Sequence, residues 1–469
     1  MKKTIIYTAA IALISWACAK NSGLKTNSTL AEDEATLATY SQYCSSCHGE
    51  KVEAFVDRKW LHGKTKDAIM SSITTGYVNA GMPSWQGTLS ESQIENLATL
   101  IESKLATVDQ YTFEEPVKEI YASEGSTVRL EKIMDGLDSP WGLTVLPDGS
   151  VLIADKNGTL HKVAKNGSKS TISGVPEVLF EGQGGLFDLE LHPDFDQNQL
   201  IYLTFAKGKK EGEKSLATTA MVRAKLVDNT LTDVQEIFEA LPYFETKHHY
   251  GGRMAFDKQG YLYVTVGDRG YRDENPQSLE NYSGKVHRIN DDGTVPADNP
   301  FVNTKGAVKS IWTYGHRNPQ GLILDPTSGE IWETEHGPRG GDELNQIEKG
   351  KNYGWPVISY GINYDATVFT NITAKEGMMQ PELYWIPSIA PCGMTYVSSD
   401  KYPAWKGDFL VGSLRFKYLN RCDMNNGKVV KEEKLLTNIG RLRNVFEGAD
   451  GYIYVGVENP GVVYRLLPQ

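Results

Sequence analysis

From about Thr127 to the C-terminus the chain repeats one pattern, in which a polar turn leads into a short run of β-branched and aromatic residues. Runs of this kind are typical of short strands. The clearest copies are Leu146–Asp155, Phe256–Val266, Leu324–Glu333 and Phe446–Val455. Copies spread over the whole segment indicate a β-propeller rather than a β-sandwich or β-helix, and about six to eight blades are compatible with their uneven spacing.

The chain has 469 residues, more than one typical domain, which predicts a multidomain protein. Lys2 and Lys3 precede the apolar run Ile5–Trp16, which predicts a signal peptide over residues 1–19. We therefore expect export to the periplasm or the cell envelope. Cys18 is a candidate for lipidation, which would be the chain's one link to a membrane. The net charge of −11 argues against a nucleic acid partner.

The sequence Cys44-Ser-Ser-Cys47-His48 is a haem c attachment motif, in which two thiols bond the porphyrin and the histidine ligates the iron. A disulfide or half of a zinc site would be the alternative for such a spacing in an exported protein. Met82, within Gly81-Met82-Pro83, is the candidate second iron ligand, and a Met ligand suits electron transfer.

Two helices are expected around this motif, over residues 32–43 and 90–105. Ser90 and Gln93 form a capping box at the start of the second helix, whose apolar positions recur on one face. Residues 32–106 resemble a monohaem class I cytochrome c. We therefore expect a small all-α cytochrome c domain between linkers at 20–31 and 107–126, followed by an all-β propeller over 127–469.

Cys392 and Cys422 remain once the haem motif and Cys18 are set aside. An oxidising compartment would permit a disulfide between them, but the sequence alone does not bring their Cα atoms together. Whether Cys392 and Cys422 form a disulfide is therefore left open.

Polar motifs interrupt the propeller where a hydrophobic core has no use for them. They are Glu181–Leu186, Lys247–Arg253, Gly267–Gly270, Gly315–Leu322, His336–Pro338, Asp342–Asn345, Asn352–Trp355 and Arg441–Arg443. At these motifs the chain resembles the soluble PQQ-dependent glucose and aldose sugar dehydrogenases, over roughly residues 130–467. This resemblance implies a six-bladed β-propeller that binds PQQ near the mouth of its central channel.

The oxidation of a hydroxyl-bearing carbon needs a base for the hydroxyl proton, and histidine suits this role near neutral pH. His249 matches the family's base and Asp268 matches the carboxylate that supports it, and Arg317 is a third catalytic candidate. His248 stands where the glucose enzyme has an acidic residue. We expect its side chain to point away from that of His249, because neighbours alternate along an extended segment.

PQQ carries three carboxylates, so its pocket needs fixed cations, and arginine binds carboxylates in a bidentate manner. The resemblance assigns this task to Gln183, Arg317, Asn318, Tyr364, Arg415, Arg441 and Arg443. Alternation along Arg441-Leu442-Arg443 predicts that both guanidinium groups share one face of a strand. The loop Pro391-Cys392-Gly393 is a weaker candidate.

Calcium is the metal that the resemblance implies. Its ligands beside the cofactor would be the carbonyls of Gly337 and Pro338, and a second, structural ion would be held by Glu343 and the carbonyl of Tyr353. Calcium takes oxygen ligands and polarises a quinone oxygen as a Lewis acid.

These features together predict an aldose dehydrogenase that forms a lactone and passes electrons from PQQ to the fused haem c. An external electron acceptor, a cytochrome or respiratory component, would then reoxidise the haem. The alternatives are a calcium-dependent propeller lactonase and a non-catalytic binding propeller, since a fold alone does not determine a function.

Overall fold

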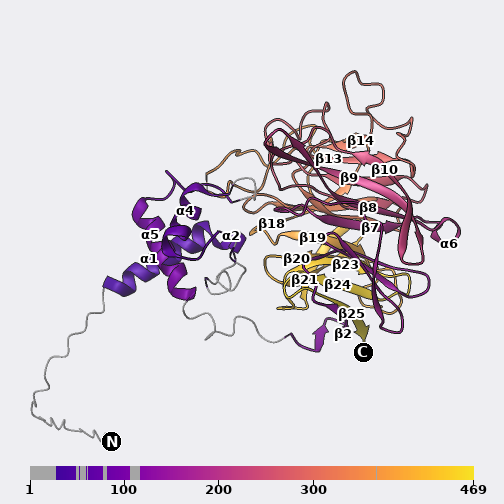
Figure 1. Cartoon of the computed structure of the whole chain (residues 1–469), viewed down its shortest axis with the longest axis horizontal. Coiled ribbons are helices and arrows are strands. Elements are labelled where there is room, and N and C mark those ends of the chain that lie inside the picture. Colours follow the sequence, from indigo (N-terminus) through magenta and orange to yellow (C-terminus); the bar gives the residue numbers. More distant parts are fainter. Residues whose placement is uncertain are drawn as a thin grey trace, which may run out of the picture.

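The computed structural model describes residues 28–48, 52, 60, 62–77, 82–105, 117–365 and 367–469. The expected signal peptide 1–19 with Cys18 lies outside the described residues, as does Gly81. Figure 1 shows a small helical unit followed along the chain by a larger unit of strands. Among the described helices, none has both the length and the apolar composition needed to span a bilayer.

The helical unit contains α1 (Ser28–Tyr43), α2 (Ser45–His48), α4 (Lys66–Thr75) and α5 (Glu91–Leu105). The expected capping box is present at the start of α5, since the N–H of Gln93 donates to Oγ of Ser90 and the N–H of Ser90 donates to Oε1 of Gln93 at 2.9 Å. The apolar face of α5 packs inward through Ile94, Leu97 and Ile101. These side chains form one core with residues of α1 and α4, so the unit has a core of its own.

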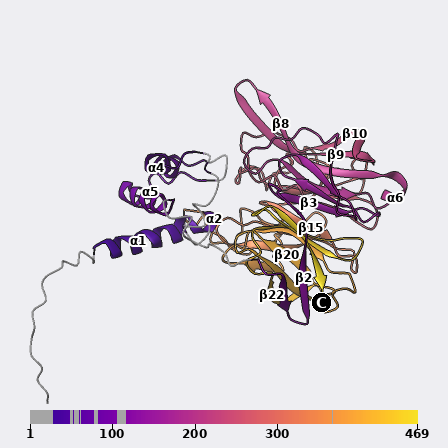
Figure 2. The same ribbon diagram turned by 60° about the horizontal axis from the view of Figure 1, so that its bottom comes forward.

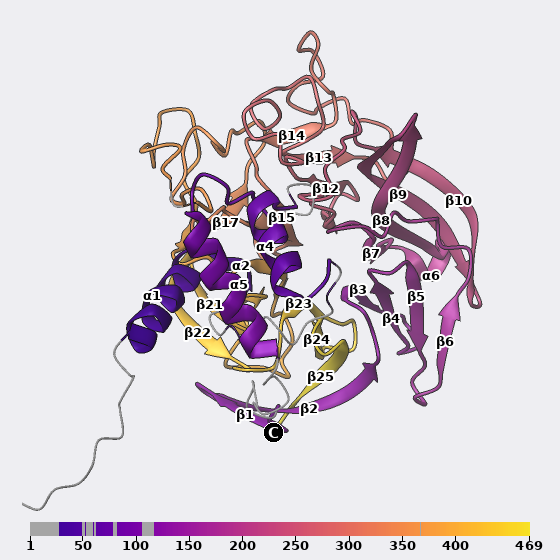
Figure 3. The same ribbon diagram turned by 60° about the vertical axis from the view of Figure 1, so that its left-hand side comes forward.

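The larger unit consists of six antiparallel sheets, which confirms the six-bladed propeller. Five of the sheets have four strands that follow one another along the chain, and the sixth has five strands. Figures 2 and 3 show the blades from two further sides. The first three blades contain β3 (Pro140–Val145), β4 (Val151–Asp155), β5 (Thr159–Val163), β6 (Lys169–Ile172), β7 (Leu186–Leu191), β8 (Leu200–Glu211), β9 (Lys214–Val227), β10 (Thr230–Glu239), β11 (Met254–Phe256), β12 (Leu262–Val266), β13 (Lys285–Ile289) and β14 (Ile311–Tyr314). The short helix α6 (Phe195–Asn198) joins β7 to β8.

The remaining blades complete the ring. They contain β15 (Pro319–Leu324), β16 (Ile331–Glu335), β17 (Asp342–Ile347), β18 (Leu383–Trp385), β19 (Pro391–Tyr396), β20 (Phe409–Ser413), β21 (Tyr418–Asn425), β22 (Lys428–Leu435), β23 (Leu442–Glu447), β24 (Ile453–Val457) and β25 (Val462–Pro468). The repeated sequence pattern has a simple structural meaning: each of its four copies is the turn that leads from the first to the second strand of a blade, into β4, β12, β16 or β24.

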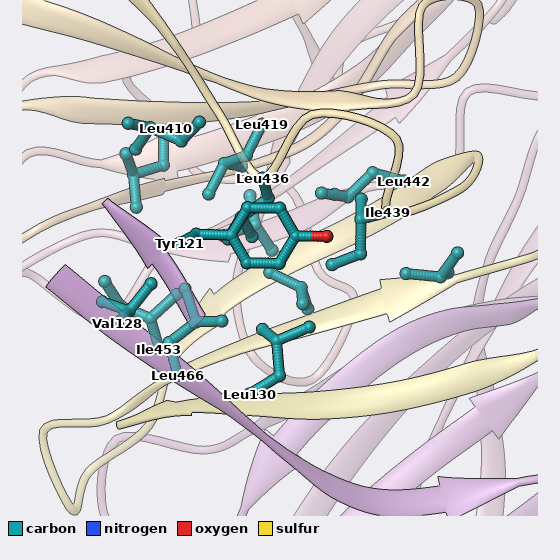
Figure 4. Close-up of a cluster of buried hydrophobic side chains, with 14 of the residues drawn as sticks. Tyr121, Val128, Leu130, Leu410, Leu419, Leu436, Ile439, Leu442, Ile453 and Leu466 are labelled. Carbon is teal, nitrogen blue, oxygen red and sulfur yellow. The ribbon is translucent and has the colours of Figure 1, made fainter. Parts of the chain in front are cut away.

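The last blade is closed by strands from the start of the unit. β1 (Ile120–Ser123) and β2 (Ser126–Asp135) extend the sheet of β25, β24 and β23. Figure 4 shows Tyr121 from β1 among Leu436, Ile439 and Leu442. The structure therefore differs from the expected boundary, because β1 lies within the range 107–126 that was assigned to a linker. Four residues of strand are too weak a sequence pattern to be separated from a linker.

Candidate active site at one rim of the propeller

Several predicted site residues lie just before the first strand of a blade or just after its second strand. Gln183 precedes β7, His249 precedes β11 and Arg317 precedes β15, whereas Asp268 follows β12. The first and second strands are antiparallel, so the start of one and the end of the other lie at the same edge. Residues far apart in sequence thus meet at one rim, around the strands that line the propeller axis.

His249 and Asp268 form the closest polar pair of this rim. Oδ1 of Asp268 lies 2.6 Å from Nδ1 of His249, and the N–H of His249 donates to Oε1 of Gln183 at 2.8 Å. Asp268 also accepts from the N–H of Gly270 at 2.7 Å and from the indole N–H of Trp355 at 2.8 Å. The carboxylate is therefore held by three donors, and it fixes the imidazole by Nδ1.

The environment sets the charge of this pair. Burial lowers the pKa of His249 and Arg317 lowers it further, and together they outweigh the opposing effect of Asp268. Burial by itself would raise the pKa of Asp268, but His249, Arg317 and the N–H of Gly270 lower it to about 2. At neutral pH the pair is thus an ionised carboxylate beside a neutral imidazole, whose Nδ1 carries the proton and whose Nε2 can accept one.

The expectation that His248 points away from His249 is wrong. The two rings meet edge to face with centroids 4.6 Å apart, and the side chain of His248 is buried. The reason is local backbone geometry, since His249 has a φ of 53° in the left-handed region and interrupts the extended segment. His248 is therefore packed against His249 in the same loop, and its replacement would disturb the position of His249.

Arg317 and Asn318 lie near the pair: the charge of Arg317 acts on His249, and Asn318 contacts the loop that carries it. The Arg317 guanidinium donates to the carbonyls of His336 and Gly337 at 3.1 and 2.7 Å, and it lies 3.5 Å from the hydroxyl of Tyr364. Oδ1 of Asn318 accepts from the N–H of Gly251 at 3.1 Å. Asn318 thus ties the start of β15 to the loop that carries His249.

Arg441 and Arg443 lie on one side of their segment, as the alternation predicted. Both guanidinium groups donate to the carboxylate of Glu458, from Nε of Arg441 at 2.5 Å and from the terminal nitrogen of Arg443 at 2.7 Å. Arg443 also donates to Oε1 of Gln320 at 2.9 Å. Glu458 was missed at the sequence level, although it follows β24 as Asp268 follows β12, and this position was the available signal.

The weaker cofactor candidates are arranged differently. Arg415 donates to the carbonyl of Ser388 at 3.1 Å, and it follows β20 at the same rim. Cys392 lies 3.6 Å from a guanidinium nitrogen of Arg443. Cys392 and Cys422 are both buried and free, so they do not form the disulfide that was left open. Strand β20 separates them, because it pairs with both β19 and β21.

The calcium candidates meet in one small cavity. Gly337, Glu343 and Tyr353 line it together with Arg317 and Glu335. Pro338 follows Gly337 and is buried. Its ring lies so close to Gly361 that a Cβ atom at that glycine would come within 3.0 Å of it. The carbonyl of Gly337 accepts from the guanidinium of Arg317. Trp355, which donates to Asp268, also lines this cavity.

A buried acidic group lies behind this cavity and was missed at the sequence level. Glu333 and Glu335 on β16 face His316, and their ligand atoms lie within 4.8 Å of one another. Burial raises the pKa of Glu333 to about 7, and Glu335 adds to this effect. Burial and Glu335 also raise the pKa of Glu343, the residue opposite Glu335 across the ladder. Burial opposes the charge of His316, but Glu333 and Glu335 outweigh this effect and raise the pKa of His316 to about 9.

Residues 137–465 match the family model for glucose/sorbosone dehydrogenases. The chain belongs to this family. A curated relative, the aldose sugar dehydrogenase YliI of Escherichia coli, is 40% identical over 352 residues, which covers 73% of this chain and 94% of the relative. The chain is thus an oxidoreductase of the glucose/sorbosone dehydrogenase family.

Solved structures agree with this family assignment. The soluble aldose sugar dehydrogenase of Escherichia coli in its apo form is similar with a TM-score of 0.70 and 38% identity, covering 73% of this chain and all of that one. The PQQ-bound aldose sugar dehydrogenase of Streptomyces coelicolor is similar with a TM-score of 0.61 and 26% identity, covering 76% of this chain and 99% of that one.

The helical unit of this family member has its own match. Residues 31–101 match the family model for subunit III of cbb3-type cytochrome c oxidase, which confirms the cytochrome c domain. Cys44 and Met82 pack against the same hydrophobic core, and His48 ends α2. The side chain of Cys47 lies outside the described residues. Ligation of iron by His48 and Met82 stays a prediction.

Proposed function

We propose that the protein oxidises an aldose to its lactone with PQQ as the oxidant and passes the electrons to the haem c of the same chain. The observation that carries this proposal is the His249–Asp268 pair, in which the carboxylate is buried and the imidazole is partly exposed and keeps Nε2 as a proton acceptor beside a group of guanidinium side chains.

The charges at the rim fit a tricarboxylate cofactor. Arg317, Arg441 and Arg443 bring three guanidinium groups to it, and Glu458 is the carboxylate that pairs with two of them. Glu458 neutralises one charge of this trio, so two positive charges and the unused donors of each planar group are left for the cofactor's carboxylates. When bound, PQQ supplies the two-electron oxidant that accepts hydride from the anomeric carbon.

The residues of the chain do the acid–base work. His249 accepts the anomeric hydroxyl proton at Nε2 as the carbonyl of the lactone forms. Asp268 stays ionised, holds Nδ1–H and stabilises the imidazolium that results. Gln183 fixes the backbone N–H of His249, so the position of the ring is set by two contacts on different blades.

Calcium fits the cavity beside this pair. The carbonyls of Gly337 and Pro338 would hold an ion near the cofactor, and Glu343 with the carbonyl of Tyr353 would hold a second. Neighbouring carboxyl groups raise the pKa of Glu333 and Glu343, and a bound cation would favour their ionised forms. A calcium ion in the first position would polarise the substrate and cofactor oxygens.

The cytochrome domain provides the next electron carrier. Two thiols at Cys44 and Cys47 would bond the haem, and His48 with Met82 would ligate its iron. Because both domains share one chain, the haem is an acceptor at high effective concentration. Export to the periplasm, or a lipid anchor at Cys18, would bring this haem to an external acceptor of the cell envelope.

Spectroscopy of the holoprotein tests the proposal. After reconstitution with PQQ and calcium, addition of an aldose should reduce the haem and release lactone. Replacement of His249 by Gln should keep PQQ binding and lower kcat by roughly 10²–10⁴-fold, the range for loss of a positioned proton acceptor. His161→Gln is the matched control, because His161 also faces an aspartate, Asp155, on another blade.

Each outcome separates the candidate functions. Lactone hydrolysis without haem reduction would favour the lactonase alternative, and sugar binding without either product would favour the binding propeller. Full turnover in His249→Gln would disprove the role of His249 as the proton acceptor.

A further inference from the structure

Arg269, which follows Asp268 directly, is a fully buried cation that the proposed mechanism does not use. Its side chain is 0% exposed. One terminal nitrogen donates to the carbonyl of His248 at 2.6 Å and the other donates to the carbonyl of Thr246 at 2.8 Å. The guanidinium carbon lies 3.5 Å from the centre of the Tyr250 ring. All three contacts are with the segment that carries His249.

The surroundings of this cation are unusual. Within the described part of the chain, no carboxylate lies at ion-pair distance from Arg269, and its Nε and the hydroxyl of Tyr250 are buried without a hydrogen-bond partner. A buried charge without an ionic partner costs free energy. Such a cost is expected where the group serves the site rather than the stability of the fold.

The backbone on both sides of the contact is also strained. His249 has a φ of 53° and Arg269 a φ of 59°, in a region that side chains other than glycine rarely adopt. Such a conformation costs free energy and persists only when its surroundings hold it. The two carbonyl contacts of Arg269 lie immediately before His249 and hold this segment.

We propose that Arg269 is a positioning residue for His249, which fixes the backbone that presents the imidazole and keeps a positive charge beside it. This inference rests on the proposed function, in which His249 is the proton acceptor. Arg269 acts through His249 and does not contact the substrate.

Five groups face the imidazole of His249. Asp268 bonds its Nδ1, and the ring of His248 meets its edge. The charges of Arg317 and Arg269 lower its pKa, and His336 faces it from the end of β16. Loss of Arg269 should therefore raise the pKa of His249, whereas its replacement by another cation should not.

Two variants separate geometry from charge. Arg269→Met removes both carbonyl contacts and the charge, so kcat should fall roughly 10²-fold, as a displacement of about 1 Å can cause, and the acid limb of the pH profile of kcat/KM should move to higher pH. Arg269→Lys keeps the charge but cannot reach both carbonyls with a planar fork. It should lower kcat and leave the acid limb in place.

Arg288→Met is the matched control. Arg288 is also buried, stacks on Tyr261 at 3.7 Å and has an Nε without a partner, but it lies on β13 away from His249. The Arg288→Met variant should have a lower unfolding midpoint, while its kcat and the acid limb of its pH profile stay as in the parent. Nitrogen NMR of the His249 ring in the PQQ-free full chain gives a second readout of its pKa.

The outcomes are decisive in both directions. A rise in the pKa of His249 in Arg269→Met, absent in Arg288→Met, supports the inference. An unchanged acid limb and an unchanged ring pKa in Arg269→Met would overturn it, and would assign Arg269 to stability alone. His249→Gln in parallel tests the proposed function separately, because the NMR readout does not require His249 to be the base.

Discussion

Replacement of Asp268 by Asn removes one charge from the site while keeping its shape. Asp268 accepts at Oδ1 from His249 and Gly270, and at Oδ2 from the indole of Trp355. An asparagine would place its oxygen at Oδ1, since two donors meet there, and its NH2 group would face the indole N–H. The imidazole would keep its tautomer, and the variant would differ from the parent mainly by the lost charge and one unpaired buried donor.

The magnitude follows from the distance. A carboxylate about 4 Å from the centre of an imidazolium stabilises it by about 4 kcal/mol at an effective dielectric constant near 20. This corresponds to about 10³-fold in kcat, if the imidazolium is fully formed in the transition state. The charge of Asp268 also raises the pKa of His249, so the acid limb of the pH profile should move to lower pH, opposite to the direction expected for Arg269→Met.

The same charge contributes to stability. The pKa of Asp268 is about 2, against an ordinary value of 3.8, a difference worth about 2–3 kcal/mol. Because the folded pKa is lowered, this contribution is present above pH 4 and is lost as the pH falls towards 2. The parent should therefore lose its advantage over Asp268→Asn in unfolding midpoint over that interval.

Steady-state kinetics with an aldose, and thermal unfolding from pH 2 to pH 8, measure these effects. Asp257→Asn is the control, because Asp257 holds the N–H groups of a turn at the other end of β11. It should lower the unfolding midpoint and leave kcat unchanged. A kcat within threefold of the parent in Asp268→Asn, or an acid limb that moves upward, would refute the role assigned to Asp268.

Three further changes test the cofactor sites. Met82→Ala should abolish the sulfur-to-iron charge-transfer band of the haem, whereas Met70→Ala, in the same core, should keep it; a band that persists in Met82→Ala would rule out that ligand. Replacement of Arg441 and Arg443 by Ala should weaken PQQ in a fluorescence titration by roughly 10²-fold or more, since each charge-assisted hydrogen bond is worth about 1.5–3 kcal/mol, and equal affinity would remove the pair from the pocket. Calcium at about 100 times its Kd should stabilise the parent by about 2.7 kcal/mol in thermal unfolding, and Glu343→Gln should lose most of this response; a full response would place the ion elsewhere.

The sequence predicted those features that depend on local pattern. The turn-to-strand copies led to the blades because each copy is a complete local unit, and the box of Ser90 and Gln93 predicted where α5 begins. The alternation at Arg441 and Arg443 predicted a shared side because strand geometry has a fixed period. These inferences needed no knowledge of which blades are neighbours.

The features that were missed depend on tertiary contacts. Glu458 pairs with both arginines only because β24 ends beside the start of β23, and Glu333 meets His316 only once β16 is placed in its sheet. The orientation of His248 was wrong because one left-handed residue changes the direction of its neighbours, and a non-glycine residue in that conformation leaves no sequence signal. The cysteine pair needed a Cα distance that no sequence provides.

The closing blade also limits how far the cytochrome domain can move from the active site. The last described residue of α5 is Leu105 and the first of the propeller is Val117, a separation that can span at most about 40 Å even if fully extended. The chain then enters β1, which pairs with β2 in the blade that carries Arg443. Ile120 pairs with Arg129, and β2 runs from there to Asp135, opposite Val462 just beyond the rim residue Glu458. Along the strand direction, Ile120 therefore lies roughly 20 Å from the rim. If electrons pass from the sugar site to a haem on the same chain, the cytochrome domain must come near this rim, and the number of residues between Leu105 and Val117 limits how far α5 can lie from β1.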